Sequence, residues 1–66
     1  MQILLNGETR TVDDAITLAT LVEQLDLSGK RIAIEVNGEL VPRSEHADHR
    51  IAAGDRVEIV QAIGGG

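Results

Sequence analysis

Two Asn-Gly dipeptides, at residues 6–7 and 37–38, set the strongest constraint on the fold of this 66-residue chain. Asn-Gly is the most typical sequence of a two-residue hairpin turn, because both of its residues accept a positive φ. Short runs with strand-like alternation flank each dipeptide, and Pro42 ends the last run because proline cannot donate to a sheet ladder. The four predicted strands span residues 2–6, 8–13, 32–36 and 39–41. We therefore expect two β-hairpins.

The segment between the two hairpins has the period of a helix. Four aliphatic residues share one helical face because they fall at positions i, i+3, i+4 and i+7: Leu18, Leu21, Val22 and Leu25. Thr17 is the predicted N-cap, and Ile16 before it can pack on Leu21 as a hydrophobic staple. Gly29 is the predicted exit from the helix.

The chain after the second hairpin is predicted to supply a fifth strand. Residues 43–50 are polar and can hold one irregular turn capped by Ser44. The turn at residues 53–55 then leads into a strand over residues 56–63. One helix covering one face of a small sheet is the two-layer arrangement of an α+β domain, which is the fold class we expect.

The predicted core is purely aliphatic, since the chain has no Phe, Tyr, Trp or Cys. Strand alternation places further side chains beside the helical stripe: Ile3, Leu5, Ile32, Ile34, Val36, Val57 and Ile59. Leu4 and Val60 then point to the open face of the sheet, away from the helix, and Ile63 lies at the end of the same strand as Val60. These three residues are the candidate partner-binding residues.

Composition argues against several classes of function. Eleven acidic and six basic side chains give a net charge of −5, whereas nucleic-acid binders carry a basic patch and often stacking aromatics. An acidic surface either maintains solubility or favours a partner with a basic face. No run approaches the roughly 20 apolar residues of a membrane span, and no signal peptide is visible. We expect a cytoplasmic protein that binds neither nucleic acid nor membrane.

The sequence offers no set of residues typical of an enzyme. It has no cysteine nucleophile, no Gly-x-Ser-x-Gly motif and no glycine-rich phosphate loop. His46 and His49 have a spacing that could hold a metal on a helix, but we interpret both as polar surface. A domain of this size also has little room for a ligand pocket. We expect neither catalysis nor a bound metal or cofactor.

The sequence ends in Gly64, Gly65 and Gly66, directly after the apolar end of the last predicted strand. We expect a domain over residues 1–63 and a flexible tail over residues 64–66. Because glycine has no Cβ, such a run can enter a narrow active site in another protein. The carboxylate at its tip is unreactive until a partner enzyme adenylates it with ATP. A frayed terminus or an expression remnant is the alternative interpretation.

Several stretches together resemble the bacterial ThiS family of thiamine-pathway sulfur carriers: MQILLNGE, TLATLVEQL, IAIEVNGELVPRSE and GDRVEIVQAIGGG. The resemblance covers essentially the whole chain, and its most specific parts are VNGELVPR and the last strand that runs into Gly-Gly. It implies the β-grasp, ubiquitin-like fold, a mixed sheet around one helix with the first and last strands side by side at its centre. One departure is His46, where many relatives have tryptophan, so an aromatic contact beside residues 43–50 is not implied here.

The resemblance also implies a carrier mechanism. An E1-like enzyme, ThiF, is expected to bind ATP and adenylate the carboxylate of Gly66, which a sulfur-donating enzyme then helps to convert to a thiocarboxylate. The thiocarboxylate passes its sulfur to thiazole synthase, ThiG, during formation of the thiazole ring of thiamine. Gly65 and Gly66 match the family's terminal pair of glycines, and Gly64 lengthens the glycine tail by one residue.

Three alternatives stay open on the sequence alone. The small subunit of molybdopterin synthase resembles this chain in fold, tail and thiocarboxylate chemistry, although such chains are usually longer and often carry aromatic or proline residues before the last glycines. A ubiquitin-like modifier would join its terminal glycine to target lysines after the same adenylation. A plain interaction domain would have a tail without a function.

Overall fold

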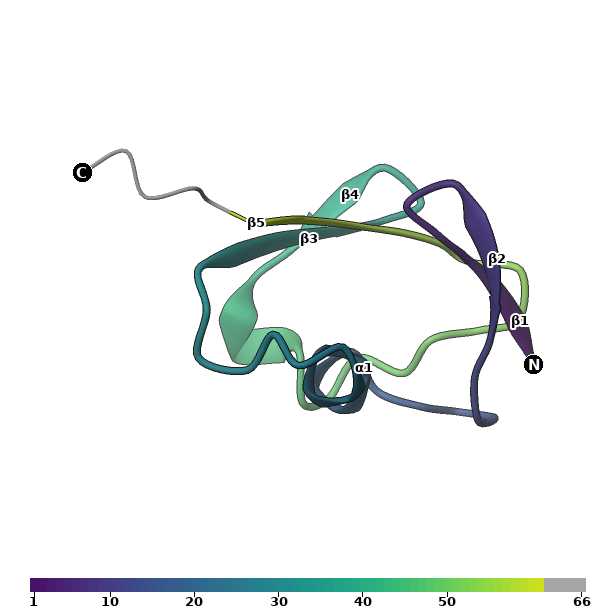
Figure 1. The fold of residues 1–66 in the computed structure, drawn as a ribbon, viewed down its shortest axis with the longest axis horizontal. Helices are drawn as coiled ribbons and strands as arrows, with labels where there is room; N and C mark the ends of the chain where they lie inside the picture. The colour runs from purple at the N-terminus through teal and green to yellow at the C-terminus, as the bar shows by residue number, and fades with distance from the viewer. Residues whose placement is uncertain (62–66) are drawn as a thin grey trace.

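A five-stranded mixed sheet lies across a single helix in the computed structural model, which describes residues 1–61 (Figure 1). The elements follow the chain in this order: β1 Gln2–Leu5, β2 Glu8–Thr11, α1 Leu18–Gln24, β3 Ile32–Val36, β4 Glu39–Val41, a 3-10 helix Arg43–Glu45, and β5 Arg56–Gln61. The predicted α+β class and both hairpins are confirmed. Residues 62–66, which include Ile63 and the three terminal glycines, lie outside the described residues.

The strands lie in the order β2-β1-β5-β3-β4, so the last strand occupies the centre of the sheet. β1 and β5 run parallel, with Leu4 beside Arg56 and Leu5 beside Val57, and the other neighbouring strands run antiparallel. Parallel neighbours need a long crossover rather than a hairpin. The chain that connects β1 to β5 includes α1, which covers one face of the sheet (Figure 1). The central pair of first and last strands that the family resemblance implies is therefore present.

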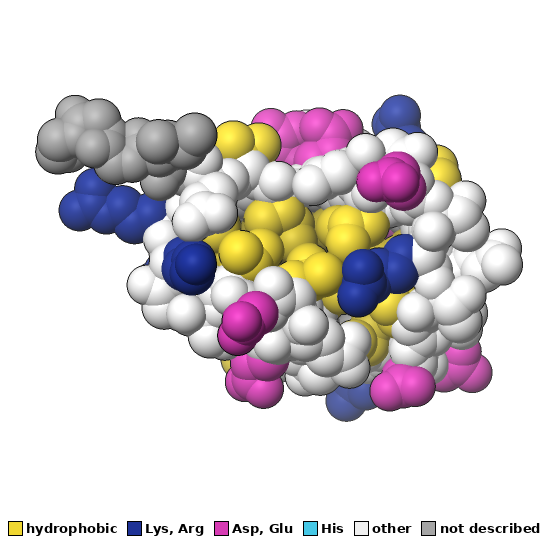
Figure 2. Space-filling view, viewed as in Figure 1, with side chains coloured by type: hydrophobic (Ala, Val, Ile, Leu, Met, Phe, Trp, Pro, Cys, Tyr) yellow, Lys and Arg dark blue, Asp and Glu magenta, His cyan; other side chains and the backbone are white. Residues whose placement is uncertain are grey.

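The core fills the layer between the sheet and α1, where Figure 2 shows apolar side chains gathered. Its buried members come from strands, helix and loops: Ile3, Val12, Ile16, Leu18, Leu21, Val22, Ile34, Val36, Val41, Ile51, Val57 and Ile59. Three residues predicted for the core are only partly buried at its margin: Leu5, Leu25 and Ile32. Three buried aliphatic residues are not anticipated by the sequence patterns: Val12, Val41 and Ile51.

The start of the helix agrees with the prediction. Thr17 has an extended backbone, and its Oγ1 accepts a hydrogen bond from the amide of Thr20 at 3.2 Å, which satisfies one of the free N–H groups of the first turn. Ile16 and Leu21, the predicted hydrophobic staple, both belong to the core.

The predicted exit of the helix at Gly29 is wrong, because Asp26 already has a left-handed backbone with φ 62°. The amide of Asp26 donates to the carbonyl of Glu23, and the amide of Leu27 donates to the carbonyl of Val22, both at 3.0 Å. These two bonds form a Schellman motif, in which glycine usually takes the position that Asp26 occupies here. The helix therefore ends one turn earlier than its sequence suggests.

The polar segment after β4 forms a 3-10 helix over Arg43–Glu45 that starts directly after Pro42 and has no side-chain cap. The predicted cap by Ser44 is wrong, since Ser44 lies inside the turn. The chain then returns to the core, where Ile51 is buried and its amide donates to the carbonyl of Ile16 at 2.8 Å. This contact holds the irregular segment against the start of α1.

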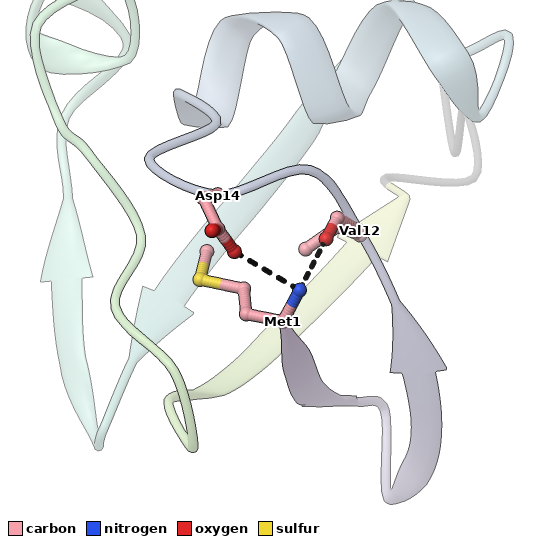
Figure 3. A network of polar contacts seen from close by, with 3 residues as sticks. All are labelled: Met1, Val12 and Asp14. Atoms are coloured by element: carbon pink, nitrogen blue, oxygen red, sulfur yellow. Dashed lines mark hydrogen bonds and ion pairs between the residues drawn. The ribbon is translucent and has the colours of Figure 1, made fainter.

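The N-terminal amine closes the open end of the first hairpin (Figure 3). It donates to the carbonyl of Val12 at 2.7 Å and to Oδ1 of Asp14 at 3.2 Å, while the amide of Val12 donates to the carbonyl of Met1 at 2.8 Å. The Asp14 side chain is 90% exposed, so we expect this ion pair to contribute little to stability.

Candidate functional site

The open face of the sheet lies opposite α1, and its exposed side chains include Leu4, Ala33, Glu35, Leu40, Arg56, Glu58 and Val60. Leu4 is 36% exposed and Val60 is 64% exposed, so the predicted placement of both outside the core is confirmed. Leu40 on β4 is a third exposed aliphatic residue, at 66%, and the prediction missed it. The signal was present, because Leu40 alternates with Val41, which is buried.

Two asparagines hold β5, the strand that leads to the terminal glycines, from both sides. On the β1 side, Oδ1 of Asn6 accepts from the amide of Ile59 at 2.8 Å and its Nδ2 donates to the Ile59 carbonyl at 3.3 Å. On the β3 side, Oδ1 of Asn37 accepts from the amide of Arg56 at 3.0 Å. The Nδ2 of Asn37 donates to Oδ1 of Asp55 at 3.1 Å. Both predicted hairpin turns therefore also position the strand before the tail.

The predicted interpretation of His46 as polar surface is wrong. Its side chain is buried, and its Nε2 lies 3.0 Å from the carbonyl oxygen of Val41. The amide of Ala19 on α1 donates to the backbone carbonyl of His46 at 3.0 Å, which brings this part of the irregular segment against the helix. An imidazole thus fills the space beside the 3-10 helix. His49, the second member of the pair, is half-exposed.

The described part of the chain presents an exposed sheet face without a cluster of metal-ligating side chains. Among residues 1–61, no three His, Cys, Asp or Glu side chains gather in a way that could hold a metal ion. No helix in the same range is long and apolar enough to cross a membrane. What the geometry provides is an exposed sheet face beside a strand whose position is fixed on both sides. The predicted site residues Ile63, Gly64, Gly65 and Gly66 follow that strand, outside the described residues.

Comparison with known proteins decides the family. The family model described as the ThiS family matches residues 3–66. The chain belongs to the ThiS family. It is 36% identical to the sulfur carrier protein ThiS of Escherichia coli (strain K12) over 66 residues, which is 100% of both chains.

Two further relatives extend this result. A crystal structure of the thiamine biosynthesis protein ThiS from Geobacter metallireducens superimposes with a TM-score of 0.83 at 30% identity and covers 100% of both chains. A thiazole synthase of Paramagnetospirillum magneticum is 38% identical over 66 residues, and here this chain spans only 20% of the relative's length. The β-grasp fold is confirmed, as is the prediction of a small sulfur carrier of thiamine biosynthesis rather than an enzyme.

Proposed function

We propose that this ThiS-family chain carries sulfur as a thiocarboxylate on Gly66. The observation that supports this most is the family match, which runs from residue 3 through the glycines to residue 66. An E1-like, ThiF-like enzyme adenylates the Gly66 carboxylate, and a thiazole synthase receives the sulfur for the thiazole ring of thiamine. ATP is bound by the adenylating partner, and we expect the exchange to take place in the cytoplasm.

The chemistry of activation explains why the carrier needs a partner. A carboxylate is a poor electrophile, so its oxygen first attacks the α-phosphorus of ATP and pyrophosphate leaves. Hydrosulfide that a donor enzyme releases then attacks the acyl carbon of the adenylate, and AMP leaves with the original oxygen. The product is a thiocarboxylate whose sulfur is the nucleophile delivered to thiazole synthase.

The described residues contribute position rather than catalysis. β5 is bonded to Asn6 on one side and to Asn37 on the other, so the last described residue, Gln61, continues a fixed strand. Glycine has no Cβ and lets surrounding atoms approach closely, which suits Gly64, Gly65 and Gly66 to a narrow active site. A reacting group displaced by about 1 Å can lose on the order of a hundredfold in rate, so a fixed starting point favours the reaction.

The partners follow from the open face and from the relatives. Leu4 and Val60, with Ile63 beyond the described residues, are proposed to contact the adenylating enzyme, since exposed aliphatic groups beside a reactive tail favour docking there. Thiazole synthases of two bacteria contain a segment similar to this whole chain. That similarity supports a thiazole synthase as the second partner.

Intact-mass measurement tests the proposal. The chain is incubated with a ThiF-like enzyme, ATP and a sulfide source, and the expected product is heavier by the exchange of one oxygen for sulfur. Omission of ATP is the control and should leave the mass unchanged. A covalent transfer to lysines of other proteins would instead indicate a modifier, and an unchanged mass in the complete reaction would contradict the proposal.

A further inference from the structure

Two glutamates stand directly opposite one another at the centre of the open face. Glu35 on β3 is paired in register with Glu58 on β5, and both side chains are exposed. Directly opposed residues of antiparallel strands have Cβ atoms about 4.5–5.5 Å apart. Leu40 on β4 is the next neighbour of Glu35 in the same row, and Val60 lies two residues beyond Glu58 on the same face. The carboxylate pair is therefore flanked by two of the most exposed aliphatic side chains of the fold.

Neither glutamate forms an ion pair within the described part of the chain. The ion pair found among residues 1–61 joins the N-terminal amine to Asp14, at the far end of the first hairpin. Arg56 shares the open face with Glu58 but its guanidinium forms no ion pair with it there. Like charges placed directly opposite in a sheet are destabilising. The fold thus holds two carboxylates without an ion-pair partner side by side, on a face that is otherwise partly apolar.

We propose that this pair receives one arginine side chain of the enzyme that adenylates the tail, with Leu40 and Val60 excluding water around the contact. The inference rests on the proposed carrier function and adds the chemistry by which the open face recognises its partner. A planar guanidinium has five donors and can bond two carboxylates at once, which an ammonium does less well. Arginines surrounded by apolar contacts are typical centres of protein interfaces. The net charge of −5 favours the same kind of partner.

Charge argues against the other occupants of this face. A second copy docked face to face would bring the glutamate pair onto an equally acidic surface, on a chain whose net charge is already −5. An anionic lipid surface would be repelled for the same reason. Figure 2 shows acidic side chains at the upper edge, above the strands, as well as along the lower edge of the molecule. A basic protein surface is the partner that this arrangement favours.

Neutralisation of each carboxylate provides the test. We expect E35Q and E58Q each to raise the Kd for the ThiF-like enzyme about tenfold, and E58K to abolish measurable binding, because charged hydrogen bonds at an interface centre are lost. The melting temperature should rise in all three variants, since each removes the repulsion across the strands. Glu23→Gln on the exposed surface of α1 removes the same charge from the other layer and is the matched control, with an unchanged Kd.

The outcomes separate this inference from the carrier function. In one outcome, the wild-type chain forms the thiocarboxylate, and E35Q and E58Q bind the enzyme as tightly as Glu23→Gln does. This result would overturn the arginine contact and leave the carrier function intact. Wild-type chain that is never adenylated would overturn both. Analytical ultracentrifugation tests for a second copy on this face. A wild-type dimer that L40D dissociates would assign the face to a second copy and would also overturn the inference. A Kd that depends less on salt in the E35Q/E58Q double variant than in the wild type and in Glu23→Gln supports it.

Discussion

The carboxamide of Asn6 brackets the backbone of Ile59, a residue 53 positions further along the chain. Its Oδ1 accepts the Ile59 amide at 2.8 Å, and its Nδ2 donates to the Ile59 carbonyl at 3.3 Å. The backbone of Asn6 is left-handed, with φ 50°, and its own amide donates to the carbonyl of Val57 at 2.9 Å. The side-chain amide of Asn6 thus makes the hydrogen bonds to β5 that the next backbone peptide of β1 would make. It extends the parallel pairing of β1 along β5.

We expect Asn6→Gly to lower the free energy of unfolding by about 1–2 kcal/mol, because two hydrogen bonds of roughly 0.5–1.5 kcal/mol each are removed. Glycine keeps the left-handed backbone without strain, so the loss reports on the side chain. Amide hydrogen exchange should accelerate at Ile59 more than at the amides that pair β3 with β4, which serve as the internal reference. Equal protection at Ile59 in variant and wild type would show that the bracket contributes nothing.

The end of α1 offers a stabilising substitution. Asp26→Gly should raise the free energy of unfolding by about 0.5–1 kcal/mol, since glycine adopts the left-handed C′ conformation more readily and the change removes an acidic group from the negative end of the helix dipole. Asp26→Asn removes the charge but keeps a Cβ at the left-handed position, so it should give a smaller gain. Thermal melts of the three proteins measure this, and a gain roughly equal for Asn and Gly would show that the backbone freedom of glycine adds nothing.

Local patterns in the sequence predict much of this fold. Asn-Gly turns, strand alternation and the capped helical stripe identify the two hairpins, α1 and the last strand, because each depends on residues close together in the chain. The same alternation places Leu4 and Val60 outside the core. The central parallel pair of β1 and β5 could not be found this way, since no turn joins these strands. It follows only from the resemblance to a known family.

Irregular backbone explains what the sequence analysis missed. Ile51 and His46 are buried in a segment with neither a helical nor a strand period, so no pattern indicates which side chains point inward. The chain leaves the helix at Asp26 rather than at Gly29, because a non-glycine residue takes the left-handed position of the Schellman motif. The opposed pair Glu35 and Glu58 depends on the register of strands that are distant in sequence.

Burial of His46 has a consequence for stability. We expect His46→Ala to lower the free energy of unfolding by about 2 kcal/mol, because the contact with the Val41 carbonyl and the packing of the ring are both lost. His49→Ala, at the half-exposed neighbouring histidine, is the control and should cost less than about 0.5 kcal/mol. Chemical denaturation of both variants checks the difference. Similar losses for the two would mean that the ring of His46 contributes no more than a surface side chain.

The aliphatic part of the open face is tested separately from its charges. Leu4→Thr and Val60→Thr should each raise the Kd for a ThiF-like enzyme about tenfold, because an interface that buries them would instead have to desolvate a hydroxyl. Threonine suits a strand, so the melting temperature should change by only a few degrees. Ala47→Thr, exposed in the irregular segment, introduces the same side chain elsewhere and should bind normally. Unaltered binding by both strand variants would exclude this face as the docking surface.

The terminal glycines should determine activity without affecting the fold. Deletion of Gly66 leaves a carboxylate on Gly65 but shortens the reach by at most about 3.6 Å. A reacting group displaced by only about 1 Å can already lose on the order of a hundredfold in rate. Gly65→Val keeps the length but adds a β-branched side chain that restricts the backbone, with Gly65→Ala as the intermediate case. We expect ATP–pyrophosphate exchange with a ThiF-like enzyme to fall steeply for the deletion and for Gly65→Val, less for Gly65→Ala, while all three melt like the wild type. Near-normal exchange by the deleted and the valine tails would refute a carrier that threads its glycines into a narrow site.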